Sequence, residues 1–229
     1  MDVQKAGRPH GPHSSAHQPH LGSLSPFLLT CTAYFLLWIP EDPPSWVGAL
    51  VKCLPVLSLV GLLRANPGPG PGSRSYSLRL QAALLFSALG DAFLIWPDLF
   101  LHGAMAFGVA QLLYTSTFGF SPLRPGLLVP VALASLPYSG LLLRHLPPDL
   151  VLPLSAYALA LSAMLWRGLA RGGSARWGAL LFAASDCLLS WHTFVRPLAH
   201  GRLLIMATYY AAQLLIALSA LQSPKLKTH

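Results

Sequence analysis

The sequence predicts an all-α, polytopic membrane protein with about eight transmembrane helices in two parallel four-helix pseudo-repeats. Three observations support this fold class: an apolar composition, eight apolar stretches of nearly membrane-spanning length, and a motif that recurs four stretches later. Of the 229 residues, 54% are hydrophobic and only 10% are charged, whereas a soluble domain carries roughly a quarter charged residues. The composition therefore excludes an ordinary soluble domain.

Eight stretches of the chain approach the roughly 20 helical residues that cross a hydrocarbon layer. They are continuously apolar rather than alternating, which favours helices over strands. We expect the first and the sixth to be short, and we expect Gly-rich linkers at 65–74 after the second and at 167–176 after the sixth. The stretches lie at about 26–39, 46–63, 78–97, 99–119, 125–143, 150–166, 176–195 and 203–222.

Basic residues are distributed unequally between the two sides of the predicted bundle. With eight spans both termini lie on one side, and that side collects eleven Lys and Arg residues against three on the other. Because basic residues accumulate on the cytoplasmic side of membrane proteins, we expect both termini in the cytoplasm. The formal net charge of +8 thus indicates topology and contact with membrane lipids, and not nucleic-acid binding.

The predicted domain organisation has three parts. Residues 1–25 are rich in His, Pro, Ser and Gly and are expected to form a disordered cytoplasmic tail. Residues 26–222 form the transmembrane domain, with halves at about 26–119 and 125–222. Residues 223–229 form a cytoplasmic C-terminal tail.

An internal repeat supports the division into halves. "ALLFSALGDAFLIW" at 83–96 in the third span is echoed by "ALLFAASDCLLSW" at 179–191 in the seventh. "AQLL" at 110–113 in the fourth span recurs at 212–215 in the eighth. An offset of four spans is even, so the two copies run in the same direction through the membrane, unlike the inverted repeats of many transporters.

Asp91 and Asp186 are the two acidic residues inside predicted spans, and they occupy equivalent positions of the repeat. A central Asp costs about 2.5–3.5 kcal/mol on insertion scales, and such residues usually face the bundle interior and mark function. If the halves pack about a pseudo-twofold axis, the two carboxyls approach each other across one cavity. Low dielectric and a like-charged neighbour favour the neutral form, so we expect at least one of them to hold its proton. The alternative is a pair of structural hydrogen-bonding groups.

Other polar residues in the spans are candidates to line the same cavity. Lys52 either reaches an interface, meets an embedded Asp, or holds a phosphate as a point charge. Polar residues on the fourth and eighth spans, Gln111 among them, form interhelical hydrogen bonds by default, with a cavity-lining role as the second interpretation. The predicted substrate-binding residues are Lys52, Tyr114, Tyr209, Tyr210 and Gln213.

Together these residues carry a family resemblance. Lys52 in "KCLP", Asp91 in "GDAFL", Asp186 in "LLFAASDCLL" and the terminal "TYYAAQLL" resemble the lysoplasmalogenase family of multi-pass membrane proteins, in particular its vertebrate liver-type members. "LWIPED", "LVKCLPVL" and "MLWRGLA" extend the resemblance over nearly the whole chain beyond the first 24 residues. One departure is Gln111, where we expect the family pattern to show His. The resemblance implies the endoplasmic reticulum membrane as the location.

The resemblance further implies hydrolysis of the vinyl ether bond of lysoplasmalogens to a fatty aldehyde and glycerophosphocholine or glycerophosphoethanolamine. A vinyl ether hydrolyses when an acid protonates its β-carbon and water traps the oxocarbenium ion. Glycosidases manage a related cation with two carboxyl groups, one as acid and one as base or stabiliser. We therefore expect Asp91 and Asp186 to be catalytic: one donates the proton, the other stabilises the cation and activates water, and the assignment between them stays open.

This chemistry requires no metal and no cofactor, because a carboxylic acid can supply the proton. The expected binding partners are the lysoplasmalogen substrate and membrane lipids, with a homodimer left open. Two other classes of function fit embedded acids: a proton- or cation-coupled transporter and a non-catalytic lipid-binding protein. GxSxG, HExxH and P-loop motifs are missing from the sequence, so serine lipase, zinc protease and nucleotide-driven functions lack support.

Overall fold

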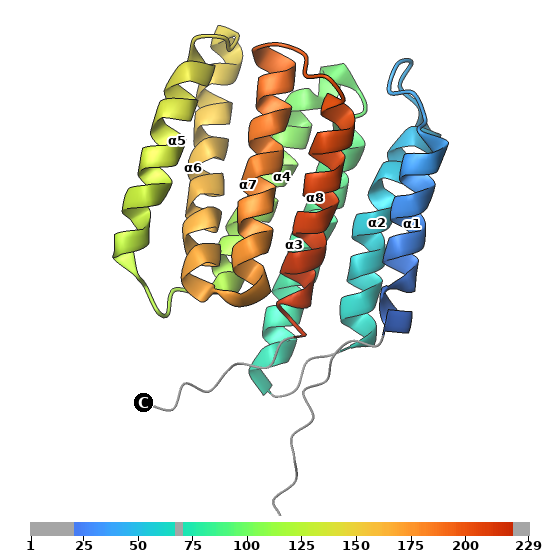
Figure 1. The fold of residues 1–229 in the computed structure, drawn as a ribbon, viewed down its shortest axis with the longest axis vertical. Coiled ribbons are helices and arrows are strands. Elements are labelled where there is room, and N and C mark those ends of the chain that lie inside the picture. The colour runs from blue at the N-terminus through green and yellow to red at the C-terminus, as the bar shows by residue number, and fades with distance from the viewer. Residues whose placement is uncertain (1–20, 67–70, 222–229) are drawn as a thin grey trace, which may run out of the picture.

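Eight α-helices, with three short 3₁₀ segments, form the part of the chain that the computed structural model describes, residues 21–66 and 71–221 (Figure 1). Successive helices run in opposite directions, so their connections alternate between the two ends of the bundle. The helices are α1 (Ser25–Leu37), α2 (Trp46–Ala65), α3 (Pro71–Phe93), α4 (Phe100–Phe118), α5 (Leu128–Leu143), α6 (Pro148–Arg171), α7 (Gly173–Phe194) and α8 (Gly201–Leu218). The predicted all-α class is confirmed.

The two predicted tails lie largely outside the described residues, namely residues 1–20 and 223–229. Residues 21–25 were expected in the N-terminal tail, but they are helical: a 3₁₀ turn at Leu21–Leu24 leads into α1. Pro26, at the start of α1, has a backbone conformation that suits the first turn of a helix.

Helix packing follows the predicted repeat. Within each half, every helix packs on the next: α1 on α2, α2 on α3 and α3 on α4, then α5 on α6, α6 on α7 and α7 on α8. The contacts between the halves are also equivalent, because α2 packs on α8 and α6 packs on α4. Each copy also carries a Leu-Pro pair, in "LPV" at 54–56 and "LPL" at 152–154, and the prolines of both pairs, Pro55 and Pro153, lie inside helices, α2 and α6.

Five of the described helical segments are long and apolar enough to cross a membrane: α2, α6, α8 and the segments that contain α4 and α5. The helix α1 is apolar but shorter. The helices α3 and α7 fall below this hydropathy because they carry polar residues, Asp91 and Asp186 among them. Each is packed between two neighbours, α3 between α2 and α4 and α7 between α6 and α8, which shelters those residues. The fold is that of a polytopic membrane protein.

The linker predicted at 167–176 is wrong in extent, as is the short sixth span. The helix α6 has 24 residues, and Gly172 alone separates it from α7. Gly172 has a φ of +80°, a left-handed conformation that glycine adopts without strain. Arg167, which the prediction placed in the linker, is fully buried, and its guanidinium donates to three backbone carbonyls of the α4–α5 connection at 2.6, 2.9 and 3.0 Å. The α3 helix likewise begins inside the predicted linker 65–74.

The outermost helices of the two halves pack with unequal tightness. The helix α1 buries Phe27 and Tyr34, and the Tyr34 ring packs edge-on against Tyr210 of α8 at 5.4 Å. In α5, which the structure describes completely, Val131 is the one buried residue. The second half is therefore loosely covered, and the cavity described below lies there.

Candidate active site

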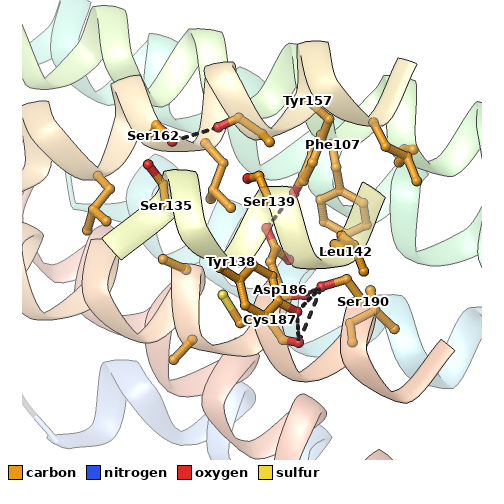
Figure 2. A pocket seen from close by; sticks show the side chains of 18 of the residues that line it. Phe107, Ser135, Tyr138, Ser139, Leu142, Tyr157, Ser162, Asp186, Cys187 and Ser190 are labelled. Carbon is orange, nitrogen blue, oxygen red and sulfur yellow. Dashed lines mark hydrogen bonds between the residues drawn. The ribbon is translucent and has the colours of Figure 1, made fainter. Parts of the chain in front are cut away.

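A cavity of about 250 Å³ lies between α4, α5, α6 and α7 (Figure 2). Its wall is mostly apolar, and on α6 alone it extends from Leu154 to Leu165, roughly 16 Å along a helix axis. Asp186 is the one carboxylate among the lining residues that the structure describes. An elongated apolar space with a few converging polar groups is the usual form of a ligand site, and this one is shaped for an aliphatic chain.

Asp186 is held by a phenol from the neighbouring helix. The hydroxyl of Tyr157 on α6 donates to Asp186 Oδ2 at 2.5 Å, and Gln111 Nε2 on α4 donates to the same Tyr157 oxygen at 3.4 Å. The side chains of Tyr157 and Asp186, which both line the cavity, meet at its wall (Figure 2). Because Tyr157 occupies Oδ2, the orientation of the carboxyl is set and Oδ1 is left for a bound molecule.

A second tyrosine, Tyr138, attaches α5 to the cavity. Its hydroxyl lies 2.7 Å from both the Cys187 backbone oxygen and the Ser190 hydroxyl on α7, directly beside Asp186 (Figure 2). These bonds go to the backbone and to a serine, so Tyr138 joins two helices without binding the carboxylate.

Asp91 lies in a separate compartment between α2, α3 and α8. It is 2% exposed, and Tyr209 of α8 donates to its Oδ2 at 2.7 Å. Lys52 of α2 is also buried. Asp91 is not among the described residues that line the cavity. Asp91 is thus enclosed with a phenol as its hydrogen-bond partner, whereas Asp186 has a phenol and the cavity.

One layer of aromatic side chains separates the two acids. Phe107 of α4 lines the cavity, while its ring also packs on Tyr209 at 5.9 Å and against Gly90, where an added Cβ would lie 2.5 Å from the ring. The repeat led us to expect both carboxyls in one cavity, but among the described lining residues only Asp186 is present.

The repeat explains this asymmetry. Phe107 and Tyr209 each stand three residues before an "AQLL" motif, so they occupy equivalent positions on α4 and α8. Tyr209 has a hydroxyl for Asp91, whereas Phe107 has none to offer Asp186. Asp186 takes its phenol from Tyr157 on α6 instead, and the Phe107 ring is left as a wall of the cavity.

The five predicted substrate-binding residues are buried in the interior, and the structure places none of them at the described cavity wall. Four of them use their side chains in hydrogen bonds. Tyr114 donates to Gln213 Oε1 at 2.6 Å, Tyr210 donates to the Lys52 backbone oxygen at 2.8 Å, and Tyr209 donates to Asp91. The one ion pair among the described residues joins Arg202 to Glu41, so the three interpretations of Lys52 stay predictions.

Sequence reasoning missed Tyr138, Tyr157 and Phe107. The two tyrosines did carry a signal, since each is a phenol near the middle of an apolar stretch. Phe107 carried none, because an aromatic residue in an apolar span is ordinary. Among the described residues, no three His, Cys, Asp or Glu side chains gather as a metal site would require.

Comparisons with known proteins place the chain in a family. The model of the YhhN family matches residues 47–220. A Sus scrofa protein named lysoplasmalogenase TMEM86B is 64% identical over 99% of both chains, and the Homo sapiens lysoplasmalogenase TMEM86B is 58% identical over 100% of both. The Homo sapiens lysoplasmalogenase TMEM86A is 40% identical over 87% of this chain and 89% of its own. No solved structure matches. The family expected from the sequence is thereby confirmed: the chain matches the YhhN family model and belongs with its relatives to the lysoplasmalogenase family.

Proposed function

We propose that this chain hydrolyses the vinyl ether bond of lysoplasmalogens and releases a fatty aldehyde together with glycerophosphocholine or glycerophosphoethanolamine. The observation that carries the proposal is Asp186, a carboxyl oriented by Tyr157 at the wall of an elongated apolar cavity. Relatives named lysoplasmalogenase over the full length support the same substrate class.

A lysolipid suits both the cavity and the way into it. A single-chain amphiphile partitions into the bilayer, and the cavity is bordered by α5, which packs loosely against the rest of the bundle. The alkenyl chain of the lysolipid would lie along the helices among the apolar lining residues. This places the vinyl ether, at the head of the chain, within reach of a group on the wall.

Asp186 is the group that we assign to proton transfer. Protonated on Oδ1, it gives its proton to the β-carbon of the vinyl ether, which forms a C–H bond and leaves an oxocarbenium ion. Water adds to the α-carbon and returns a proton to the Asp186 carboxylate, so the acid is regenerated. The resulting hemiacetal passes its hydroxyl proton to the glycerol oxygen as the C–O bond breaks, giving aldehyde and alcohol. Positioned acid–base groups contribute about 10²–10⁴-fold.

Asp91 is assigned an electrostatic part in the same reaction. The Tyr209 hydroxyl donates to Asp91 Oδ2 at 2.7 Å, a hydrogen bond that stabilises a carboxylate anion. A fixed negative charge one aromatic layer away stabilises a cation formed in the cavity, because the protein interior screens charge weakly. This revises the division of roles between the two acids that the sequence led us to expect, since Asp186 both donates the proton and receives one back.

We further infer that the protein resides in the endoplasmic reticulum membrane with both termini in the cytoplasm. The family resemblance supports the location. The orientation is supported by the excess of basic residues at one end, where α1 begins and α8 ends (Figure 1).

The test uses purified protein given a vinyl ether lysolipid or its saturated ether analogue, with released aldehyde measured. The unmodified protein should release aldehyde from the first lipid alone. Asp186→Asn should lower the rate at least about 10²-fold, and Asp98→Asn, at an exposed acid of the 3₁₀ segment Pro97–Leu99, serves as the matched control. Activity of Asp186→Asn above roughly a tenth of normal would refute the assignment. Ion-gradient-dependent uptake without aldehyde release would instead indicate a transporter.

A further inference from the structure

A second groove, with a volume of about 450 Å³, lies between the end of α2 and the start of α3. None of its described lining residues also lines the cavity beside Asp186. Both helix ends lie at the end of the bundle where α1 begins and α8 ends (Figure 1). The groove is lined by Leu63, Arg64, Arg74, Ser77, Leu78 and Gln81.

A short chain of hydrogen bonds holds one arginine of the groove in place. Arg64 Nε donates to Gln81 Oε1 at 3.2 Å, and Gln81 Nε2 donates to Ser77 Oγ at 3.2 Å. Gln81 and Ser77 are 8% and 5% exposed, so this chain is anchored in the protein. It leaves both Nη groups of Arg64 without an acceptor in the described part of the chain. Arg74 is exposed and makes no hydrogen bond within that part either.

The groove contains two positive charges and no carboxylate among its described lining residues. No Asp or Glu occurs between residues 43 and 90, and the next acid on α3, Asp91, lies ten residues beyond Gln81. That spacing corresponds to roughly 15 Å along a helix axis. The one ion pair among the described residues joins Arg202 to Glu41 at the other end of the bundle. Because two guanidinium groups in one groove repel each other, an anion bound between them would remove an electrostatic cost.

The kind of donor in the groove favours phosphate. A guanidinium presents parallel N–H donors that match two oxygens of one phosphate group. Ser77 adds a hydroxyl, while the Gln81 amide is already used on both of its atoms. The groove therefore offers a phosphate two forked donors and one single donor.

The position of the groove along the helices indicates which phosphate it meets. Basic side chains at the end of a spanning helix lie at the level of the lipid headgroups. Leu78, next to Ser77 on α3, is 55% exposed and extends the groove with an apolar surface for an acyl chain. Choline and ethanolamine headgroups carry an ammonium that the two arginines would repel, whereas a headgroup without one leaves the phosphate charge uncompensated.

We propose that the groove binds the phosphate of an anionic phospholipid whose headgroup has no ammonium, such as phosphatidylglycerol. The phosphate lies between the guanidinium groups of Arg64 and Arg74 and accepts from the Ser77 hydroxyl, with an acyl chain against Leu78. This lipid has no vinyl ether and is not a substrate; it joins α2 to α3. The proposal does not rest on the function proposed above, because it concerns a separate groove.

The binding test uses the purified full-length chain in a neutral detergent and native mass spectrometry. Phosphatidylglycerol and phosphatidylcholine with identical acyl chains are compared, and the unmodified protein should bind the first at least about tenfold more tightly. Arg64→Gln and Arg74→Gln should each lower that affinity about tenfold, the effect of one lost hydrogen bond to a charged group. Equal affinities for the two lipids, or an unchanged phosphatidylglycerol affinity in Arg74→Gln, would overturn the proposal.

A matched control separates the groove from the overall charge of this end of the bundle. Arg176 is exposed on α7 at the same end and is not among the described lining residues. Arg176→Gln removes the same charge and should leave the phosphatidylglycerol affinity within about twofold, because exposed charges at a distance are screened. A loss equal to that of Arg74→Gln would assign binding to surface charge and contradict the site.

Thermal unfolding in detergent distinguishes a lipid from a phosphate compound without acyl chains. Phosphatidylglycerol should raise the unfolding midpoint of the unmodified protein but not that of Arg74→Gln, and the two midpoints should agree without lipid because Arg74 is exposed. Glycerol phosphate at the same concentration should produce no rise, and a full rise would overturn the lipid as the occupant. No step uses the lysolipid, so a failure of the proposed hydrolysis leaves this test unaffected.

Discussion

Removing the Tyr157 hydroxyl is the sharpest test of how the candidate site is organised. Tyr157→Phe takes away the 2.5 Å bond to Asp186 Oδ2 and leaves Gln111 Nε2 without its acceptor. The ring stays, so the cavity wall is kept. Asp186 becomes a carboxylate as it gives up its proton, and a hydrogen bond to a charged group contributes about 1.5–3 kcal/mol, where about 1.4 kcal/mol corresponds to a factor of ten. We therefore expect kcat/KM to fall about 10- to 150-fold.

The assay is aldehyde release from a vinyl ether lysolipid by purified protein over a range of substrate concentrations. Most of the loss should be in kcat, because Tyr157 orients the acid rather than the lipid chain. Tyr138→Phe is the matched control: it removes a phenol from the same cavity, but that phenol binds Ser190 and the Cys187 backbone instead of the carboxylate. Its effect should be much smaller.

The reasoning would be refuted by either of two results. Tyr157→Phe with the kcat of the unmodified protein would show that the orientation of Asp186 does not depend on this bond. Equal losses in Tyr157→Phe and Tyr138→Phe would show that any phenol at the wall matters in the same way, for example through helix packing.

Two further changes test the packing and the cavity. Gly168→Ala should destabilise the bundle by about 1–3 kcal/mol, because its Cβ would lie 2.4 Å from the Cβ of Ala179. Thermal unfolding in detergent should show a lower midpoint for this variant than for Gly61→Ala, where nothing lies within 4 Å of an added Cβ. Equal midpoints would contradict the close contact between α6 and α7. Ser139→Phe adds a ring to the cavity wall on α5 and should raise the KM for long-chain lysolipids more than the KM for short-chain ones. The expected rise is about tenfold, which corresponds to lost contacts of one or two methylenes. A rise in KM that does not depend on chain length would show that the lipid binds elsewhere.

Much of the fold and part of the site could be read from the chain. The apolar runs, and the unequal number of basic residues on the two sides of the membrane, follow from the cost of polar groups in hydrocarbon. That cost acts on each segment separately. The repeated "AQLL" and "ALLF…D" motifs likewise marked Asp91 and Asp186 as equivalent residues at the centre of the molecule. The ends of the helices were harder to predict, as the continuation of α6 to Arg171 shows, because local turn chemistry competes with tertiary contacts.

The sequence by itself determined that two acids lie inside an eight-helix bundle, one in each half. Only the tertiary structure decided that they differ: Asp186 faces the cavity with Tyr157, and Asp91 is enclosed with Tyr209, behind the Phe107 ring. The physical reason is that a side chain's neighbours depend on how each helix is rotated and how closely it packs, and both are set by all the helices together. At the equivalent positions Phe107 and Tyr209, only the tyrosine has a hydroxyl for its acid, while the loose packing of α5 leaves the cavity beside Asp186.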